Sequence, residues 1–190
     1  VLSMDWDDIA QTIASRLGAT LDASCEALVR AHAASHSSLL DHAVEVLREL
    51  HAPHRALVVA TKGLAKYQQP VLDALSLTPL FHAILTPDTH NGLKKHAAFF
   101  GAWPSDTRLQ IMVGDRYDDD VLGPGGHGFK TIWKPVTADP IFPKKDPFAR
   151  AMLYEYTAQQ TTPADAIINT LDELPAVVRH LELAVLGFSD

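Results

Sequence analysis

Four aspartates lie within six positions directly after the short apolar segment 109–113. They are Asp115, Asp118, Asp119 and Asp120. Carboxylates packed this closely repel one another unless a cation joins them. Mg²⁺ binds proteins through one or two carboxylates together with waters and phosphate oxygens. An acidic helix start accounts equally well for Asp118 and Asp119, but it leaves Asp115 unexplained. The pattern therefore favours a metal site in this segment.

A hydroxyl and two ammonium groups follow two earlier apolar segments, 56–60 and 82–86. The triplet Thr61-Lys62-Gly63 comes after the first and can offer a hydroxyl and backbone N–H groups to an anion; an ordinary turn is the simpler interpretation. The pair Lys94–Lys95 comes after the second, where a lysine can neutralise a phosphate and an aspartate together. A solvated helix face explains the two lysines as well, so each signal is weak by itself.

The apolar segments have the length and boundaries of strands buried on both faces. We expect strands over 56–60, 82–86, 109–113, 129–133 and, more weakly, 166–170. Helical patterns occupy 65–75, 94–100, 118–122 and 171–183 between them. Strands that alternate with helices predict an α/β fold, a Rossmann-like three-layer α/β/α core around a parallel sheet. Ligands of such sheets bind at the carboxyl ends of the strands, where the polar groups described above are expected.

The first fifty residues have a purely helical pattern. An amphipathic helix is expected over 3–18, with Ser3 as its cap and Gly18 ending it. A second helix is expected after Asp22, and a third over 38–50 with a capping-box-like start at Ser38. Segment 135–147 contains four prolines and predicts an irregular surface excursion.

Composition narrows the possible partners. The chain has 190 residues and a net charge of −7 without a basic cluster, which argues against a nucleic-acid partner. No apolar run approaches the length of a membrane span. The single cysteine, Cys25, excludes an internal disulfide and fits a cytoplasmic setting. The ten histidines are expected to be mostly surface or structural residues. The sequence leaves the oligomeric state open.

The order strand–Thr, strand–Lys, strand–Gly-Asp-x-x-x-x-Asp resembles motifs II, III and IV of the haloacid dehalogenase (HAD) superfamily. The resemblance covers roughly residues 40–180, and Gly114-Asp-Arg-Tyr-Asp-Asp-Asp-Val-Leu-Gly123 is its most specific part. It implies a core over 37–190 and a small helical cap segment over 1–36. It also implies a Mg²⁺-dependent phosphatase-type hydrolase that acts on a small phosphorylated metabolite through an aspartyl-phosphate intermediate.

The resemblance implies a role for each matching residue. Thr61 would hydrogen-bond the transferring phosphoryl group, with Lys62, Gly63 and Lys95 as further substrate contacts. Lys94, the better match to the motif lysine, would orient the nucleophile. Asp115 would ligate Mg²⁺, and Asp120 or Asp119 would support the ion directly or through water. These groups are expected to converge on one phosphate–magnesium pocket.

The first motif of the family, Asp-x-Asp-x-Thr after a strand, has one candidate here, Asp5-Trp-Asp-Asp-Ile9. Ile9 replaces the threonine, and Trp6 belongs to the stripe of a helix already begun. The alternative expectation is that residues 3–35 are cap helices and that the nucleophile strand is absent from this sequence. Two other functions remain open: a metal-independent 2-haloacid dehalogenase, and a non-catalytic binding module of the same fold.

Overall fold

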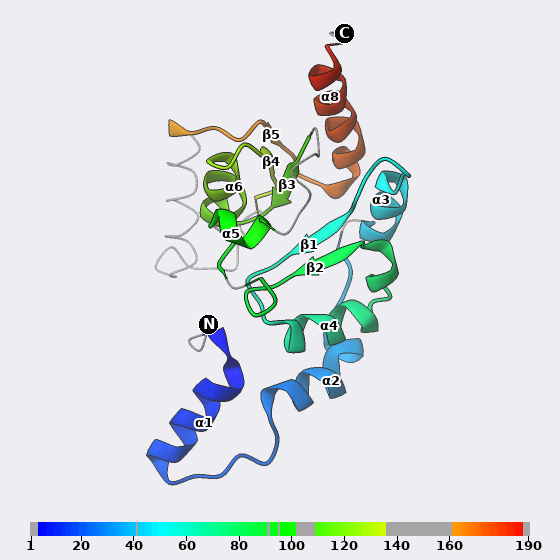
Figure 1. Cartoon of the computed structure of the whole chain (residues 1–190). Helices are drawn as coiled ribbons and strands as arrows, with labels where there is room; N and C mark the ends of the chain where they lie inside the picture. The colour runs from blue at the N-terminus through cyan, green and yellow to red at the C-terminus, as the bar shows by residue number, and fades with distance from the viewer. Residues whose placement is uncertain are drawn as a thin grey trace. The chain divides into compact units, whose positions relative to one another are not determined.

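The computed structural model describes residues 4–40, 42–90, 92–94, 96–101, 109–135 and 161–187. The chain forms two compact units, residues 1–93 with 98–102 and residues 94–97 with 103–190. Each unit contains parallel strands and helices (Figure 1), so the predicted α/β fold is confirmed. The division into a cap over 1–36 and a core over 37–190 remains a prediction.

The first unit contains a two-stranded parallel sheet. Strand β1 (Val58–Ala60) pairs with β2 (Ala83–Leu85) in the register Val59↔Ile84. Helix α4 (Ala65–Ala74) follows β1, and α3 (Ala43–Leu50) precedes it. Helix α2 (Cys25–His36) packs along α4, as Figure 1 shows. The short 3-10 turn η2 (Thr78–Leu80) and helix α5 (Ala97–Phe100) complete the described elements of this unit, whose boundary falls within α5.

Helix α1 (Trp6–Leu17) is capped at both ends by residues that suit these positions. Asp5 is its N-cap and accepts a hydrogen bond from the Asp7 N–H, while Gly18 ends it at φ 64°, a left-handed conformation that glycine adopts without strain. The predicted cap Ser3 lies outside the described residues. Only Ala14 of this helix is buried, whereas Trp6, Ile9, Ile13 and Leu17 are exposed. Most of the apolar stripe of this amphipathic helix is therefore exposed in the described structure.

The third predicted helix begins later than its sequence pattern suggested. Helix α3 starts at Ala43 after His42, which caps it without a side-chain hydrogen bond, so Ser38 is not its cap. Backbone at 37–40 is already non-helical after α2. The helix expected over 94–100 is likewise shorter, since α5 starts at Ala97.

The second unit contains a three-stranded parallel sheet in the order β3–β4–β5. Strand β3 (Ile111–Gly114) pairs with β4 (Lys130–Trp133), which pairs in turn with β5 (Ala166–Ile167). The segment η3 (Tyr117–Leu122) is π-helical and runs into the short α6 (Gly123–Gly125). The 3-10 turn η4 (Leu171–Glu173) opens α8 (Leu174–Leu186) through a capping box of Thr170 and Glu173.

A small aromatic core holds η3 against the sheet of the second unit. Tyr117 and Trp133 meet edge to face with ring centroids 4.9 Å apart, and Val121 completes the buried cluster. The Tyr117 hydroxyl donates to the Thr162 carbonyl oxygen. The turn after β3 is thus anchored to β4 and to the segment before β5. The predicted excursion at 135–147 lies outside the described residues, apart from Pro135.

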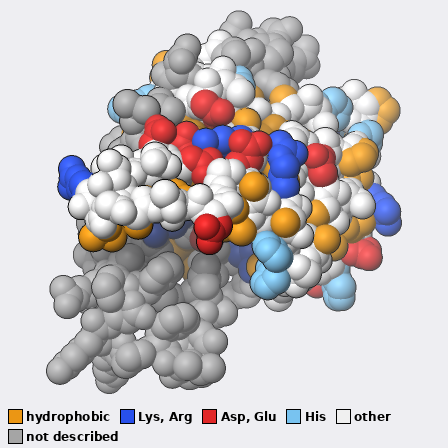
Figure 2. Space-filling model, turned by 90° about the horizontal axis from the view of Figure 1, so that it is seen from below, with side chains coloured by type: hydrophobic (Ala, Val, Ile, Leu, Met, Phe, Trp, Pro, Cys, Tyr) orange, Lys and Arg blue, Asp and Glu red, His pale blue; other side chains and the backbone are white. Residues whose placement is uncertain are grey.

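No helix in the described ranges is long and apolar enough to cross a membrane. On the face drawn in Figure 2, basic side chains are interspersed with acidic ones.

Candidate active site

The carboxyl end of β3 carries the acidic segment. Asp115 directly follows the strand and is exposed, while Asp119 and Asp120 on η3 are 5% and 2% exposed. Asp118 is exposed and lies 3.5 Å from the Arg116 guanidinium. The sequence alone did not show which of these four carboxylates are buried. On the π-helical segment η3, Asp119 and Asp120 are buried and Asp118 is exposed.

Asp120 forms a buried ion pair with Lys94. The Lys94 ammonium contacts Asp120 Oδ1, and the two side chains are 11% and 2% exposed. Asp120 Oδ2 accepts the Arg116 N–H at 2.9 Å. Among the residues that the structure describes, Oδ1 accepts no further hydrogen bond. Burial raises the pKa of the Asp120 carboxyl, and the nearby Asp115 adds to this rise, although Lys94 and the Arg116 N–H act against it.

Gly114 is required where it stands because the Asp120 carboxylate lies directly over it. A Cβ built at Gly114 would overlap Asp120 Oδ2 and Cγ. This close approach gives a physical reason for a glycine before Asp115. The glycine leaves the space that brings the Asp120 carboxylate back to the end of the strand.

Asp115 is positioned through its backbone by a residue that the sequence interpretation missed. The Trp133 indole Nε1–H, at the end of β4, donates to the Asp115 carbonyl oxygen at 3.0 Å. Since Trp133 also packs on Tyr117, one side chain links both strand ends to η3. Its position at the end of a strand adjoining β3 was the available signal.

Thr61 lies at the carboxyl end of β1, in the first unit. Its N–H donates to the Leu85 carbonyl oxygen at 3.1 Å, and its Oγ1 accepts the Gly63 N–H at 3.1 Å. Lys62 is exposed and Gly63 is half-buried. This tight turn leads straight into α4. Thr61 and Lys94 belong to different units, and their convergence on one pocket remains a prediction. Lys95 lies outside the described residues.

The end of β2 carries two polar residues that the sequence analysis passed over, Thr86 and Asp88. Thr86 is fully buried and hydrogen-bonds Thr89. Asp88 Oδ1 accepts the N–H of Ala65, at the start of α4, at 3.2 Å. Burial raises the pKa of Asp88, but hydrogen bonds from Thr86 and Ala65 outweigh it and lower the pKa overall. Asp88 therefore substitutes for a side-chain cap, which Leu64 cannot supply.

Asp5 and Asp7 belong to a helix start, not to a strand end. Lys66 Nζ lies 2.8 Å from Asp5 and 3.0 Å from Asp7. The Tyr67 hydroxyl lies 2.6 Å from Asp5 Oδ1, and Asp7 Oδ1 accepts the Cys25 N–H. Hydrogen bonds from Lys66 and Tyr67 lower the pKa of Asp5 to about 2. Both carboxylates thus hold α1 against the start of α4 and α2, and the geometry does not favour them as the nucleophile motif.

Similarity to known proteins agrees with the sequence resemblance. The chain is 34% identical over 114 residues to a phosphoglycolate phosphatase of Caulobacter vibrioides, and this match covers 54% of the chain and 48% of the relative. The chain thus spans about half the length of that relative. No family model matches the present chain.

Several solved structures of HAD proteins resemble the chain. The HAD phosphatase of Thermococcus onnurineus matches 92% of this chain and 71% of its own, with a TM-score of 0.66 and 22% identity. The L-2-haloacid dehalogenase of Xanthobacter autotrophicus matches 90% of this chain and 73% of its own, with a TM-score of 0.62 and 20% identity. A magnesium-bound HAD hydrolase of Bacillus subtilis, YfnB, matches 75% of this chain and 56% of its own, with a TM-score of 0.55 and 18% identity. These likenesses show that the chain has the α/β fold of HAD proteins.

Proposed function

We propose that this protein is a Mg²⁺-dependent phosphatase that hydrolyses a small phosphorylated metabolite through an aspartyl-phosphate intermediate. The observation that carries the proposal is the buried Lys94–Asp120 pair beside Gly114 at the end of β3. An ammonium and two carboxylates at a strand end suit the binding of a phosphate together with a hard cation.

The residues present fit a magnesium ion. Asp120 Oδ1 is buried against the Lys94 ammonium, and the exposed Asp115 directly follows β3. In the described ranges no group of three or more His, Cys, Asp or Glu side chains could hold a metal, which is compatible with Mg²⁺ because this ion takes one or two carboxylates and completes its shell with water and substrate. Asp115 would bind the ion, and Asp120 or Asp119 would support it directly or through water. When bound, Mg²⁺ neutralises charge on the transferring phosphoryl group.

The side chains of this chain would act by position and charge. The Thr61 hydroxyl accepts a hydrogen bond from Gly63, so its own proton is available to a phosphoryl oxygen. The backbone of Lys62 and Gly63 and the ammonium of Lys95 are proposed as further phosphate contacts. Lys94 would offset charge and hold the nucleophile, which we propose to be an aspartate other than Asp5 and Asp7 because those two cap and secure α1.

Phosphoglycolate is the first substrate to assay, since the sequence relative is a phosphoglycolate phosphatase. The natural full-length protein should release phosphate from it, or from a generic aryl phosphate, only with Mg²⁺ present. Asp115→Asn should lower kcat/KM by about 10²-fold, the usual effect of removing one charge-stabilising group. The matched control is Asp118→Asn, because the Asp118 side chain is exposed and contacts the Arg116 guanidinium. Absence of metal-dependent turnover over a broad panel of phosphate esters would overturn the proposal.

Dehalogenation of a 2-haloacid is the second candidate, favoured by the match to the Xanthobacter dehalogenase. The acidic segment argues against it, because uncompensated carboxylates repel an anionic substrate. Chloride release from 2-chloropropionate that is unaffected by a chelator would place this candidate first.

A further inference from the structure

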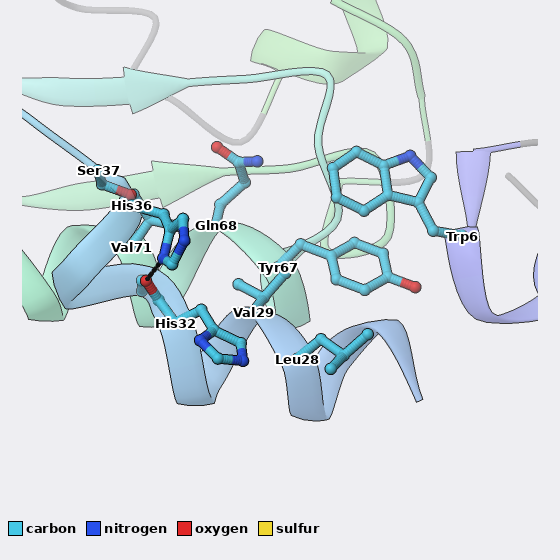
Figure 3. Close-up of a pocket in the computed structure, with 10 residues that line it drawn as sticks. Trp6, Leu28, Val29, His32, His36, Ser37, Tyr67, Gln68 and Val71 are labelled. Atoms are coloured by element: carbon cyan, nitrogen blue, oxygen red, sulfur yellow. Dashed lines mark hydrogen bonds between the residues drawn. The ribbon is translucent and has the colours of Figure 1, made fainter. Parts of the chain in front are cut away.

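Two histidines on α2 lie one helical turn apart at the wall of an apolar pocket. His32 and His36 are four residues apart, a spacing that puts their side chains on one face of the helix. Their rings meet edge to face with centroids 5.4 Å apart. Both are exposed, and both line a pocket of about 510 Å³ between α2, α4 and the start of α1. Figure 3 shows them at one end of this pocket, away from Trp6 and Tyr67.

The hydrogen bonds of His36 leave one ring nitrogen available. Its Nδ1 lies 2.8 Å from Ser35 Oγ and 3.3 Å from the His32 carbonyl oxygen, the contact drawn as a dashed line in Figure 3. A ring whose Nδ1–H donates to a carbonyl presents the Nε2 lone pair, and metal-binding histidines are commonly held in this way. Within the described part of the chain, the His32 ring has a contact only with His36, so its nitrogens are also available.

We propose that His32 and His36 form a two-imidazole site for a borderline divalent metal ion of the zinc and copper class. Imidazole nitrogens suit these ions, whereas Mg²⁺ takes oxygen ligands, so this site is distinct in chemistry from the one proposed beside Asp115. The positions that the two rings leave open would take water, or an anionic group of a molecule in the pocket.

A second histidine pair in the same unit provides a matched comparison. His51 and His82 stack with centroids 5.7 Å apart, but His82 Nδ1 accepts the Leu57 N–H at 3.1 Å. Neutral His82 therefore carries its proton on Nε2 and has no lone pair to give to a metal. Ring proximity alone does not distinguish the two pairs. The hydrogen bonds favour the α2 pair, because the Leu57 N–H occupies His82 Nδ1.

The test is titration of the full chain with Zn²⁺ alone and with Cu²⁺ alone, by calorimetry and, for Cu²⁺, by electron paramagnetic resonance. We expect one dominant site with two nitrogen ligands. His32→Gln or His36→Gln should each weaken it roughly a hundredfold, because two linked ligands gain about that much from each other. His51→Gln should leave the affinity unchanged.

Both α2 histidines are exposed, so circular dichroism should show these variants folded, and a loss of binding then reports on ligation. Retention of the tight site in both α2 variants, or an equal loss in His51→Gln, would overturn the proposal. Neither outcome bears on phosphatase activity, which is assayed with Mg²⁺.

Discussion

Lys66 and Lys94 each pair with aspartate, but in opposite surroundings. Lys66 lies between Asp5 and Asp7, and these side chains are 29%, 19% and 23% exposed. Lys94 pairs with Asp120, at 11% and 2% exposure. The pKa of Asp5 falls to about 2 because Lys66 and Tyr67 hydrogen-bond it. Burial raises the pKa of Asp120 despite its own lysine. The same two side-chain types thus secure a helix start in one unit and form a cation-binding candidate in the other.

The largest expected difference between the clusters is in stability. Asp120→Ala leaves the Lys94 ammonium buried without its partner, which should lower the free energy of unfolding by about 3–5 kcal/mol. Asp5→Ala should have a clearly smaller effect, because solvent reaches Lys66 and Asp7 remains beside it. Urea denaturation measures both. Equal losses would show that burial does not separate the clusters.

A second prediction concerns the space that Asp120 occupies. Gly114→Ala places a methyl group where the Asp120 carboxylate lies, and such overpacking should cost about 1–3 kcal/mol and displace the carboxylate. Gly125→Ala is the matched control, since its Cβ would meet only Thr131 Cγ2 at 3.7 Å, an ordinary contact. Thermal unfolding compares the two variants. A Gly125→Ala loss as large as that of Gly114→Ala would contradict the close approach described here.

The smallest expected effect is on stability in acid. It sharpens the comparison because the pKa of Asp5 is lowered and that of Asp120 is raised. Asp5 has a folded pKa of about 2 against 3.8 for an ordinary aspartate. It therefore stabilises the fold above about pH 4, and this contribution is lost as the pH falls toward 2. Asp120, with its raised pKa, instead costs stability as the pH rises above 3.8. Asp5→Asn should flatten the loss of stability between pH 4 and 2.

Salt provides the control for that experiment. At 1 M salt the Debye length is about 3 Å, so exposed pairs are screened far more than buried ones. High salt should reduce the difference between the natural protein and Asp5→Asn at pH 5, while leaving the Asp120→Ala difference nearly unchanged. If salt reduced the stability differences of Asp5→Asn and Asp120→Ala equally, the Lys94 pair would be as accessible to ions as the Lys66 cluster.

Local sequence pattern was sufficient to predict the strands and the polar residues that follow two of them. The strand predicted at 109–113 became β3 at Ile111–Gly114, and the helix predicted at 65–75 became α4 at Ala65–Ala74. These succeed because a strand buried on both faces is a continuous apolar run, whatever surrounds it. Gly114-Asp115 and Thr61 follow such runs directly, so their places at strand ends could be read from the sequence.

Tertiary structure decided which polar groups are buried and which nitrogen of a ring is available. Asp118 and Asp120 are two residues apart, yet a π-helical turn and Lys94 make one exposed and the other buried. The Trp133 bond to Asp115 joins residues 18 apart, and the Leu57 N–H that occupies His82 comes from 25 residues away. Side-chain type and spacing indicate strand ends and helix faces, because those depend on neighbours along the chain. Burial and hydrogen-bond partners depend on segments that meet only after folding.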